Sequence, residues 1–235
     1  MKKVIIFLFI SISSLIFCQN IVFKDKIIEK EILKIYDKNN DGFISKKETE
    51  DIRSLDLSDK EIEYLSDISN FSNLEKIILT NNLISKINLE NLPKLREFYC
   101  AGNKLIEFKI KNLENLEKLA LSRNYLKSIS IKNSPKIESL YLFSNQLTEI
   151  NLKKFPNLKF ADLDNNNLIK LDISKNPKLI QITILHNKIT ELDITNNNDL
   201  KVNILYRDNF VKIKTNNKNN IEQASLPPPP VVIQK

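Results

Sequence analysis

The chain has 235 residues, of which 42% are hydrophobic, so it is long enough to bury one sizeable core. Its formal net charge is +7, and its 36 lysines and arginines are spread along the chain rather than clustered, which argues against nucleic acid as a partner. Only two cysteines are present, Cys18 and Cys100; if Cys18 is removed with an N-terminal signal or is lipidated, Cys100 has no partner and no disulfide stabilises the fold.

The segment 1–19 is predicted to be a secretion signal. Two lysines precede an apolar run over residues 4–17, and a charged sequence of ordinary composition follows. The run is short for a membrane span, so an uncleaved anchor helix is the less favoured interpretation. We expect cleavage near Cys18 to Asn20 and a secreted, periplasmic or cell-surface protein with no remaining transmembrane span. Lipidation at Cys18 is a minor alternative, because Phe17 stands where a lipoprotein signal needs a small residue.

Residues 37–48, DKNNDGFISKKE, carry oxygen-bearing side chains in the order of an EF-hand calcium loop, with Gly42 at the sharp turn. An apolar helical stripe precedes the loop, formed by Ile27, Ile28, Ile32, Leu33 and Tyr36. Residues 45–53 are expected to start the exiting helix. The sequence therefore predicts Ca²⁺ as a cofactor, with ligands at Asp37, Asn39, Asp41, Phe43 (through its carbonyl), Ser45 and Glu48. The alternative is an acidic turn between two helices.

From residue 74 onward the sequence repeats with an unvarying period of 21. The unit LEKIILTNNLISKINLENLPK (74–94) is followed by LREFYCAGNKLIEFKIKNLEN and then by LEKLALSRNYLKSISIKNSPK. Positions one, four, six and eleven are apolar and position nine is Asn, and an earlier unit over 52–73 is one residue longer. Alternation around positions four and six is typical of a strand, and one short strand buries its apolar face only by stacking on its copies.

This pattern, LxxLxLxxNxL, resembles the leucine-rich repeat family, and units with this period, or one residue longer, are similar to those of internalin-like bacterial proteins. The resemblance covers eight units over residues 52–215. It implies a solenoid with a parallel β-sheet on its concave face. Internalin-like proteins carry a helical, EF-hand-like cap over the first repeat, so the resemblance also implies that residues 20–51 form such a cap, stabilised by calcium. Residues 216–235, which contain four consecutive prolines, are expected to be a disordered tail.

Four further features of the repeat carry structural predictions. The Asn at position nine is expected to face inward and to bond backbone groups of adjacent coils. Positions fourteen and sixteen are also apolar, which predicts short strands or extended segments on the opposite side rather than helices. Cys100 stands where other units have Leu or Ile and is expected to be a small buried hydrophobe. In the last unit Asn203 and Asp208 depart from the pattern, which suggests a fraying or capping coil.

The residues that vary between units are predicted to face solvent on the concave sheet. Large apolar side chains occur there beside charged ones, a composition typical of protein interfaces, although aromatic residues also suit exposed strands in general. The candidate ligand-binding residues are Tyr99, Tyr141, Phe143, Phe160, Asp162, Asp164, Leu185, His186, Tyr206 and Arg207.

No catalytic constellation is recognisable, so the protein is not expected to be an enzyme. Asp162 and Asp164 form a conceivable carboxylate pair, but a glycosidase also needs a deep cleft. The leading hypothesis is an exported, monomeric protein-interaction module whose concave sheet binds another protein. The alternatives are a glycan-binding surface protein, which would use the same aromatic residues, and a structural envelope protein without a discrete ligand.

Overall fold

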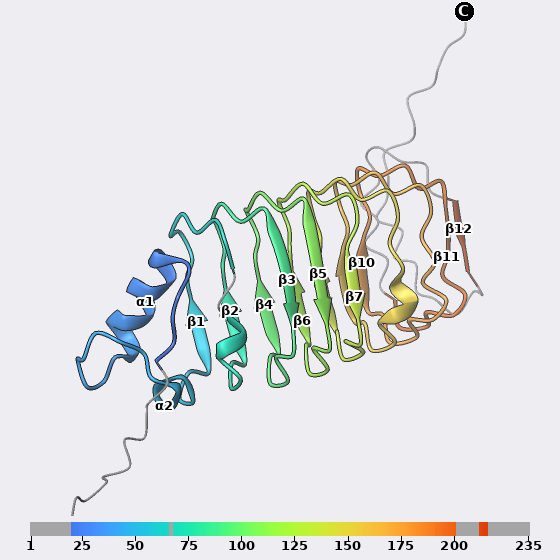
Figure 1. The fold of residues 1–235 in the computed structure, drawn as a ribbon. Coiled ribbons are helices and arrows are strands. Elements are labelled where there is room, and N and C mark those ends of the chain that lie inside the picture. The colour runs from blue at the N-terminus through green and yellow to red at the C-terminus, as the bar shows by residue number, and fades with distance from the viewer. Residues whose placement is uncertain (1–19, 66–67, 201–211, 216–235) are drawn as a thin grey trace, which may run out of the picture.

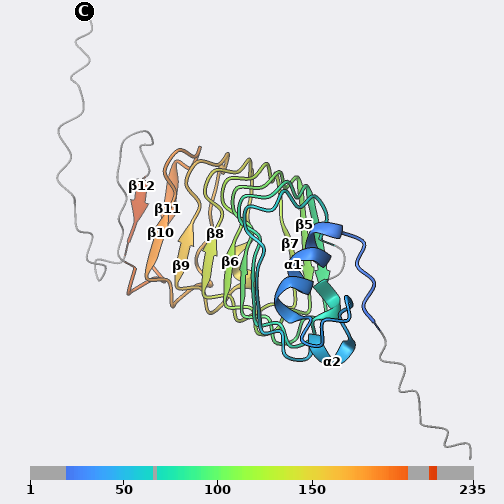
Figure 2. The ribbon, with the colours of Figure 1, turned by 90° about the vertical axis from the view of Figure 1, so that its left-hand side faces the viewer.

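A computed structural model describes residues 20–65, 68–200 and 212–215, which form a stack of parallel coils with two helices at one end (Figure 1). Each coil contributes a short strand to one side of the stack, and the chain then returns along the opposite side. Figure 2, turned by 90°, shows the coils following one another from the two helices to the opposite end of the stack. The predicted leucine-rich repeat solenoid is confirmed.

The main sheet, called here the long sheet, has seven parallel strands in the order β1-β2-β4-β6-β8-β9-β10. Each strand has three residues, with the position-four residue in its middle: Ser54–Asp56, Lys76–Ile78, Glu97–Tyr99, Lys118–Ala120, Ser139–Tyr141, Phe160–Asp162 and Gln181–Thr183. Successive partners are one repeat period apart, as in Leu119 and Leu140, except that Leu55 pairs with Ile77. The register therefore reproduces both the constant period and the longer first unit.

The opposite side of the stack is extended, as predicted, but it is not one continuous sheet. Three strands pair there in parallel, namely β3 (Lys86–Glu90), β5 (Glu107–Lys111) and β7 (Ser130–Lys132). The next coil has the 3₁₀ turn η2 (Leu152–Lys154) instead, and pairing resumes only between β11 (Glu191–Asp193) and β12 (Lys212–Lys214). A further 3₁₀ turn, η1 (Ile68–Asn70), lies in the first coil.

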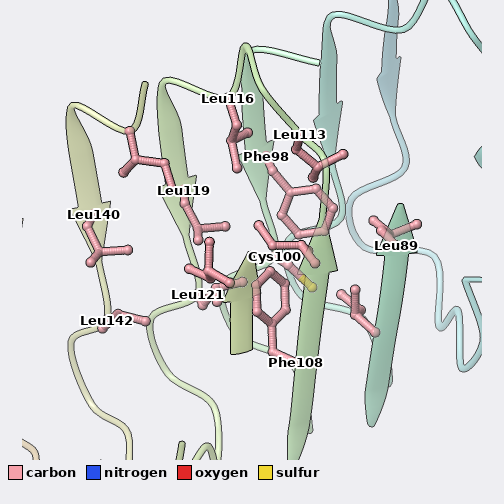
Figure 3. Packing of buried hydrophobic residues seen from close by; sticks show 14 of the residues in the cluster. Leu89, Phe98, Cys100, Phe108, Leu113, Leu116, Leu119, Leu121, Leu140 and Leu142 are labelled. Atoms are coloured by element: carbon pink, nitrogen blue, oxygen red, sulfur yellow. The ribbon is translucent and has the colours of Figure 1, made fainter. Parts of the chain in front are cut away.

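The core runs through the middle of the stack between the two sides (Figure 3). The apolar residues of positions one, four, six and eleven are buried in every described coil. Phe98 and Phe108, from opposite sides of one coil, meet edge to face with ring centroids 5.9 Å apart. Cys100 is fully buried beside them, and burial raises the pKa of its thiol, so it acts as an apolar core residue.

The asparagines at position nine form the predicted ladder. Each described one is buried: Asn82, Asn103, Asn124, Asn145, Asn166 and Asn187. The Asn124 side chain shows the pattern, because its Nδ2 donates to the Cys100 and Leu121 carbonyls and its Oδ1 accepts from the Leu105 N–H. The side chain thus bonds backbone groups that the turn after the strand leaves unpaired. The departures at Asn203 and Asp208 lie outside the described residues.

Two helices precede the first coil. α1 (Lys26–Tyr36) begins at Asp25, whose side chain accepts from the Ile27 and Ile28 N–H groups. Of the predicted apolar stripe, Ile28 and Ile32 are buried and Leu33 and Tyr36 partly so, whereas Ile27 is 38% exposed and does not belong to the buried face. α2 spans only Lys46–Thr49, so the exiting helix is shorter than expected. It ends early because Ile52 is already buried in the first coil and the chain enters β1 soon after.

Contacts of three kinds join this helical segment to the first coil. Phe23 stacks on Phe71 with ring centroids 6.2 Å apart. The Tyr36 hydroxyl donates to the Ser54 carbonyl on β1 at 2.8 Å, and Glu31 pairs with Lys60 at 3.1 Å. The apolar residues of the helical segment and of the coils therefore belong to one continuous core.

Candidate ligand-binding surface and calcium loop

Six of the predicted ligand-binding residues lie side by side in the C-terminal half of the long sheet. Tyr141 on β8 is the register partner of Asp162 on β9, and Phe160 is on β9 as well. Phe143, Asp164 and Leu185 are each the second residue after the end of β8, β9 and β10, respectively. Along the chain, one buried residue lies between Tyr141 and Phe143, between Phe160 and Asp162, between Asp162 and Asp164, and between Thr183 and Leu185. Because side chains alternate between the two faces of an extended chain, all six residues face outward. We call this set (Tyr141, Phe143, Phe160, Asp162, Asp164, Leu185) the aromatic–acidic surface. Tyr141 is 37% exposed and the other five are half-buried.

Tyr99 lies apart from this surface, because Ala120 on β6 separates it from Tyr141. The Tyr99 hydroxyl donates to Glu97 at 3.0 Å, and the Lys76 ammonium lies 5.4 Å from its ring centroid. Glu97 also pairs with Lys76 at 3.2 Å and with Lys118 at 3.1 Å. Burial alone would raise the pKa of Glu97, but these hydrogen bonds outweigh it and the pKa is lowered. Tyr99 therefore belongs to a network in which Lys76 and Lys118 balance the charge of Glu97.

The remaining predicted residues differ in placement. His186 is exposed and follows Leu185 at the turn after β10, where its φ is +52°. The equivalent positions of other coils, Asn81, Arg123 and Ser144 among them, also have positive φ, so His186 occupies a regular turn of the repeat. Tyr206 and Arg207 lie outside the described residues.

The two carboxylates of the aromatic–acidic surface accept hydrogen bonds from a hydroxyl and from backbone N–H groups. Asp162 Oδ1 accepts from the Thr183 hydroxyl at 2.8 Å, and Asp164 Oδ1 accepts from the Leu185 N–H at 2.6 Å. Burial raises the pKa of Asp164 above its ordinary value, and the nearby Asp162 raises it further, while the Leu185 N–H, Thr183 and His186 act in the opposite direction. The ionised form of Asp164 is thus less favourable in the folded protein than in the unfolded chain.

We expect the Asp164→Asn variant to gain stability relative to the wild type as the pH rises. Because the folded-state pKa of Asp164 is raised, its ionisation disfavours folding above the unfolded-state pKa of about 4, and this cost persists at pH 7. Because Asp164 is only half-buried, solvent screening keeps this cost small. Thermal melts of both proteins between pH 3 and pH 7 measure the difference.

Asp56→Asn is the matched control of opposite sign. Asp56 is on β1 of the same sheet, and hydrogen bonds from Ser58 lower its pKa. Its ionised form therefore favours folding, and the Asp56→Asn variant should lose relative stability as the pH rises. The same pH trend in both variants would contradict the interpretation of Asp164.

Glu48, the last carboxylate of the predicted calcium loop, forms hydrogen bonds with Lys38 near the beginning of the loop and with Ser45. Glu48 is buried, its Oε1 accepts from the Lys38 N–H at 3.0 Å, and its Oε2 accepts from the Ser45 N–H and hydroxyl at 2.8 and 2.7 Å. The Ser45 N–H and hydroxyl are the main causes that lower the pKa of Glu48. At the start of the loop, Asp37 accepts from the Asp41 and Gly42 N–H groups. Glu48 thus connects the beginning of the loop to the start of α2.

A short backbone segment pairs with this single loop. The Ile21 N–H donates to the Ile44 carbonyl at 2.8 Å, and Asn20 forms an antiparallel bridge with Ser45. The residues directly after the predicted signal therefore lie along the second half of the loop.

The loop fits Ca²⁺ in the chemistry and order of its donors. It offers three carboxylates, the Asn39 amide oxygen, the Phe43 carbonyl and the Ser45 hydroxyl, all hard oxygen ligands. Gly42 takes the left-handed conformation, φ +81°, that the loop turn requires. In the structure the carboxylates of the loop accept backbone hydrogen bonds. Within residues 20–65, 68–200 and 212–215, no three Asp, Glu, His or Cys side chains lie close enough together to hold a metal ion.

One surface feature escaped the sequence analysis. A hollow of about 480 Å³ lies on the side opposite the long sheet, beside β7, and its apolar lining is formed by Ile129, Ile131, Ile150, Phe155 and Leu171. It lies where the strand pairing of that side is interrupted. The sequence signal is the replacement of Asn at position eighteen by Lys154: Asn91, Asn112 and Asn133 have positive φ there, which Asn tolerates better than Lys.

The fold has solved counterparts. An internalin (InlF) from Listeria monocytogenes matches 83% of this chain at 22% identity with a TM-score of 0.59, and 64% of its own length is covered. The leucine-rich repeat domain of APL1B matches 72% of this chain at 22% identity with a TM-score of 0.62, and 52% of its own length is covered. The chain thus spans less than two thirds of either structure. At this identity the likeness establishes the leucine-rich repeat fold alone. No protein-family model and no curated protein matches the sequence.

The helices of the described residues are short. α1 has 11 residues, and no helix in that part of the chain combines the length and apolar character that a membrane span needs. The predicted secretion signal over residues 1–19 lies outside the described part and stays a prediction.

Proposed function

We propose that the protein is an exported protein-interaction module that binds a protein ligand through the outer face of its long sheet. The observation that carries this proposal is the aromatic–acidic surface, where four large apolar side chains keep solvent exposure on neighbouring coils. Grouped apolar side chains with a polar surround are typical of interaction sites, and Tyr is enriched among the residues that dominate binding energy. A repeat solenoid suits this role, because its constant residues build the core and the others are free to vary.

The arrangement favours recognition over catalysis. The aromatic–acidic surface lies on an open sheet of three-residue strands, and the hollow described above lies on the other side of the stack. The two solved counterparts are repeat domains as well, which agrees with a binding module.

Replacing two aromatic residues tests the proposed surface. We expect the Tyr141→Ala/Phe143→Ala double variant to lose partner capture while its melting temperature stays close to that of the wild type, because both side chains face outward from the core. The mature chain, residues 20–235, would serve as bait for envelope and host extracts, with quantitative mass spectrometry of the captured proteins.

Tyr125→Ala is the matched control for this experiment. Tyr125 is 54% exposed but lies after the ladder asparagine, outside the long-sheet strands, so its removal should leave capture unchanged. Equal capture by the double variant and the wild type would contradict the proposal. Binding on a glycan array without protein capture would instead support the glycan-binding alternative.

We further propose that residues 20–51 cap the first coil and that Ca²⁺ stabilises this cap. The open end of a solenoid exposes apolar core and strand backbone, which a lid must cover. The Phe23–Phe71 stack and the Tyr36–Ser54 hydrogen bond support this role, and the donor set of the loop supports calcium. Export through a signal over residues 1–19 fits a calcium-dependent protein, because extracellular calcium is abundant.

A further inference from the structure

Charge pairing differs between the two halves of the long sheet. In the N-terminal half Glu97 has two lysine partners, at 3.2 and 3.1 Å, and a tyrosine hydroxyl at 3.0 Å. In the C-terminal half Asp162 and Asp164 accept from a hydroxyl and from backbone N–H groups, and no lysine or arginine of the described residues forms an ion pair with either. Two carboxylates two residues apart, Asp162 at the end of β9 and Asp164 just after it, thus have no ion-pair partner among the lysines and arginines in the described part of the protein.

The surroundings of these carboxylates are apolar. Tyr141 stands directly across from Asp162 on the neighbouring strand, Phe160 precedes it on the same strand, and Phe143 and Leu185 lie on the coils before and after Asp164. Apolar neighbours remove water from part of the carboxylates, which is why burial raises the pKa of Asp164. A cation brought to this place would interact with two carboxylates at reduced solvent screening and with aromatic ring faces as well.

We propose that the aromatic–acidic surface binds a segment of a partner protein that presents an arginine or lysine, with the cationic group held by Asp162 and Asp164 and its apolar neighbours packed on Tyr141, Phe143 and Phe160. This inference rests on the proposed function and specifies the chemistry of its ligand. Arginine fits best, because its planar guanidinium both stacks on aromatic rings and pairs with carboxylates. Charge complementarity of this kind also selects among partners, since an acidic segment would be repelled.

A positional-scanning library of hexapeptides, with acetylated and amidated ends, tests the inference without knowledge of the natural partner. We expect the mature chain to retain peptides with arginine or lysine at one position. Replacing that residue in a retained peptide by citrulline or norleucine should weaken binding about ten-fold or more, the size of effect seen when one partner of a close charge pair is removed.

The protein variants carry the decisive comparison. Asp162→Asn/Asp164→Asn should lose the preference for the basic residue and bind the arginine and citrulline peptides alike. Glu97→Gln, which changes a carboxylate already paired with lysines, should keep the preference. Melting temperatures of all variants confirm that each is folded.

Three results would overturn the inference. Retained peptides without a basic preference would refute it while leaving the proposed function standing. An equal loss of preference in Glu97→Gln and in the aspartate variant would show that overall charge, and not this surface, attracts the cation. A library from which no peptide is retained would count against both the inference and the proposed function.

Discussion

The Asn145→Ala variant is expected to be about 3–5 kcal/mol less stable than the wild type. Asn145 is buried, its Nδ2 donates to the Leu121 and Leu142 carbonyls at 3.0 Å, and its Oδ1 accepts from the Leu126 N–H at 3.1 Å. Alanine leaves the Leu126 N–H in a dry turn without a partner, which costs about 1–3 kcal/mol. The Leu121 and Leu142 carbonyls keep their hydrogen bonds from Asn124 and Asn166, and each of the two bonds that they lose adds about 1 kcal/mol. The midpoint of urea unfolding, followed by circular dichroism, measures the loss.

Asn157→Ala separates burial from hydrogen bonding in this test. The Asn157 side chain also connects coils, since it donates to the Pro135 carbonyl and accepts from Lys178, but it does so at the surface. Water replaces its bonds when it is removed, so a loss below about 1 kcal/mol is expected. Comparable losses in both variants would mean that the buried ladder has no special role in stability.

The core and the long sheet follow from the sequence because one physical requirement recurs in every repeat unit. A residue such as Ile182 has polar neighbours on both sides and an equivalent apolar residue one coil away, so only stacking of copies buries it. The asparagine ladder also follows from the sequence, because an Asn that recurs at one position among apolar residues can be buried in the core only if its side chain is hydrogen-bonded. Period and polarity together thus predict fold, register and burial.

The side opposite the long sheet was harder to predict, because small changes there alter backbone conformation rather than burial. Apolar residues at positions fourteen and sixteen continue from Ile87 and Leu89 to Leu192 and Ile194, yet strand pairing is interrupted between β7 and β11. At position nineteen the repeat changes from Leu92 and Leu113 to Asn176 and Asn197, which are fully buried and donate to carbonyls of the preceding coil. This second run of buried asparagines is visible in the repeat alignment, but its partners become apparent only from the structure.

For the candidate surface, the sequence predicts which residues face outward but not which of them act together. Tyr99 and Tyr141 occupy the same repeat position, and only the structure shows that Tyr99 is held by Glu97 and Lys76 whereas Tyr141 stands beside Asp162. Pairing of charges across strands depends on side-chain reach and rotamer, which periodicity does not determine. That no described lysine or arginine pairs with Asp162 or Asp164 is for the same reason a structural finding.

Calcium is expected to raise the melting temperature of the mature protein, and EDTA to lower it. Ligand that binds only the folded state stabilises it by RT ln(1 + [L]/Kd), which is about 2.7 kcal/mol at a calcium concentration 100 times the dissociation constant. The effect should reach the whole melt rather than the helices alone, because Ile28, Ile32 and the first coil belong to one buried cluster. Differential scanning calorimetry in excess calcium or in EDTA measures the shift, and titration calorimetry measures the binding itself.

Two carboxylate variants locate the effect in the loop. Glu48→Gln keeps the size of the side chain and an oxygen acceptor for the Ser45 hydrogen bonds, but it removes the charge of the twelfth loop position, so the difference between calcium and EDTA should vanish. Asp51→Asn changes an exposed carboxylate that lies just outside the loop and pairs with Lys38 at 2.6 Å, so its response to calcium should match that of the wild type. If wild-type melts coincide in calcium and EDTA and no heat of calcium binding is detected, residues 37–48 are an acidic turn whose carboxylates serve only the backbone hydrogen bonds seen in the structure.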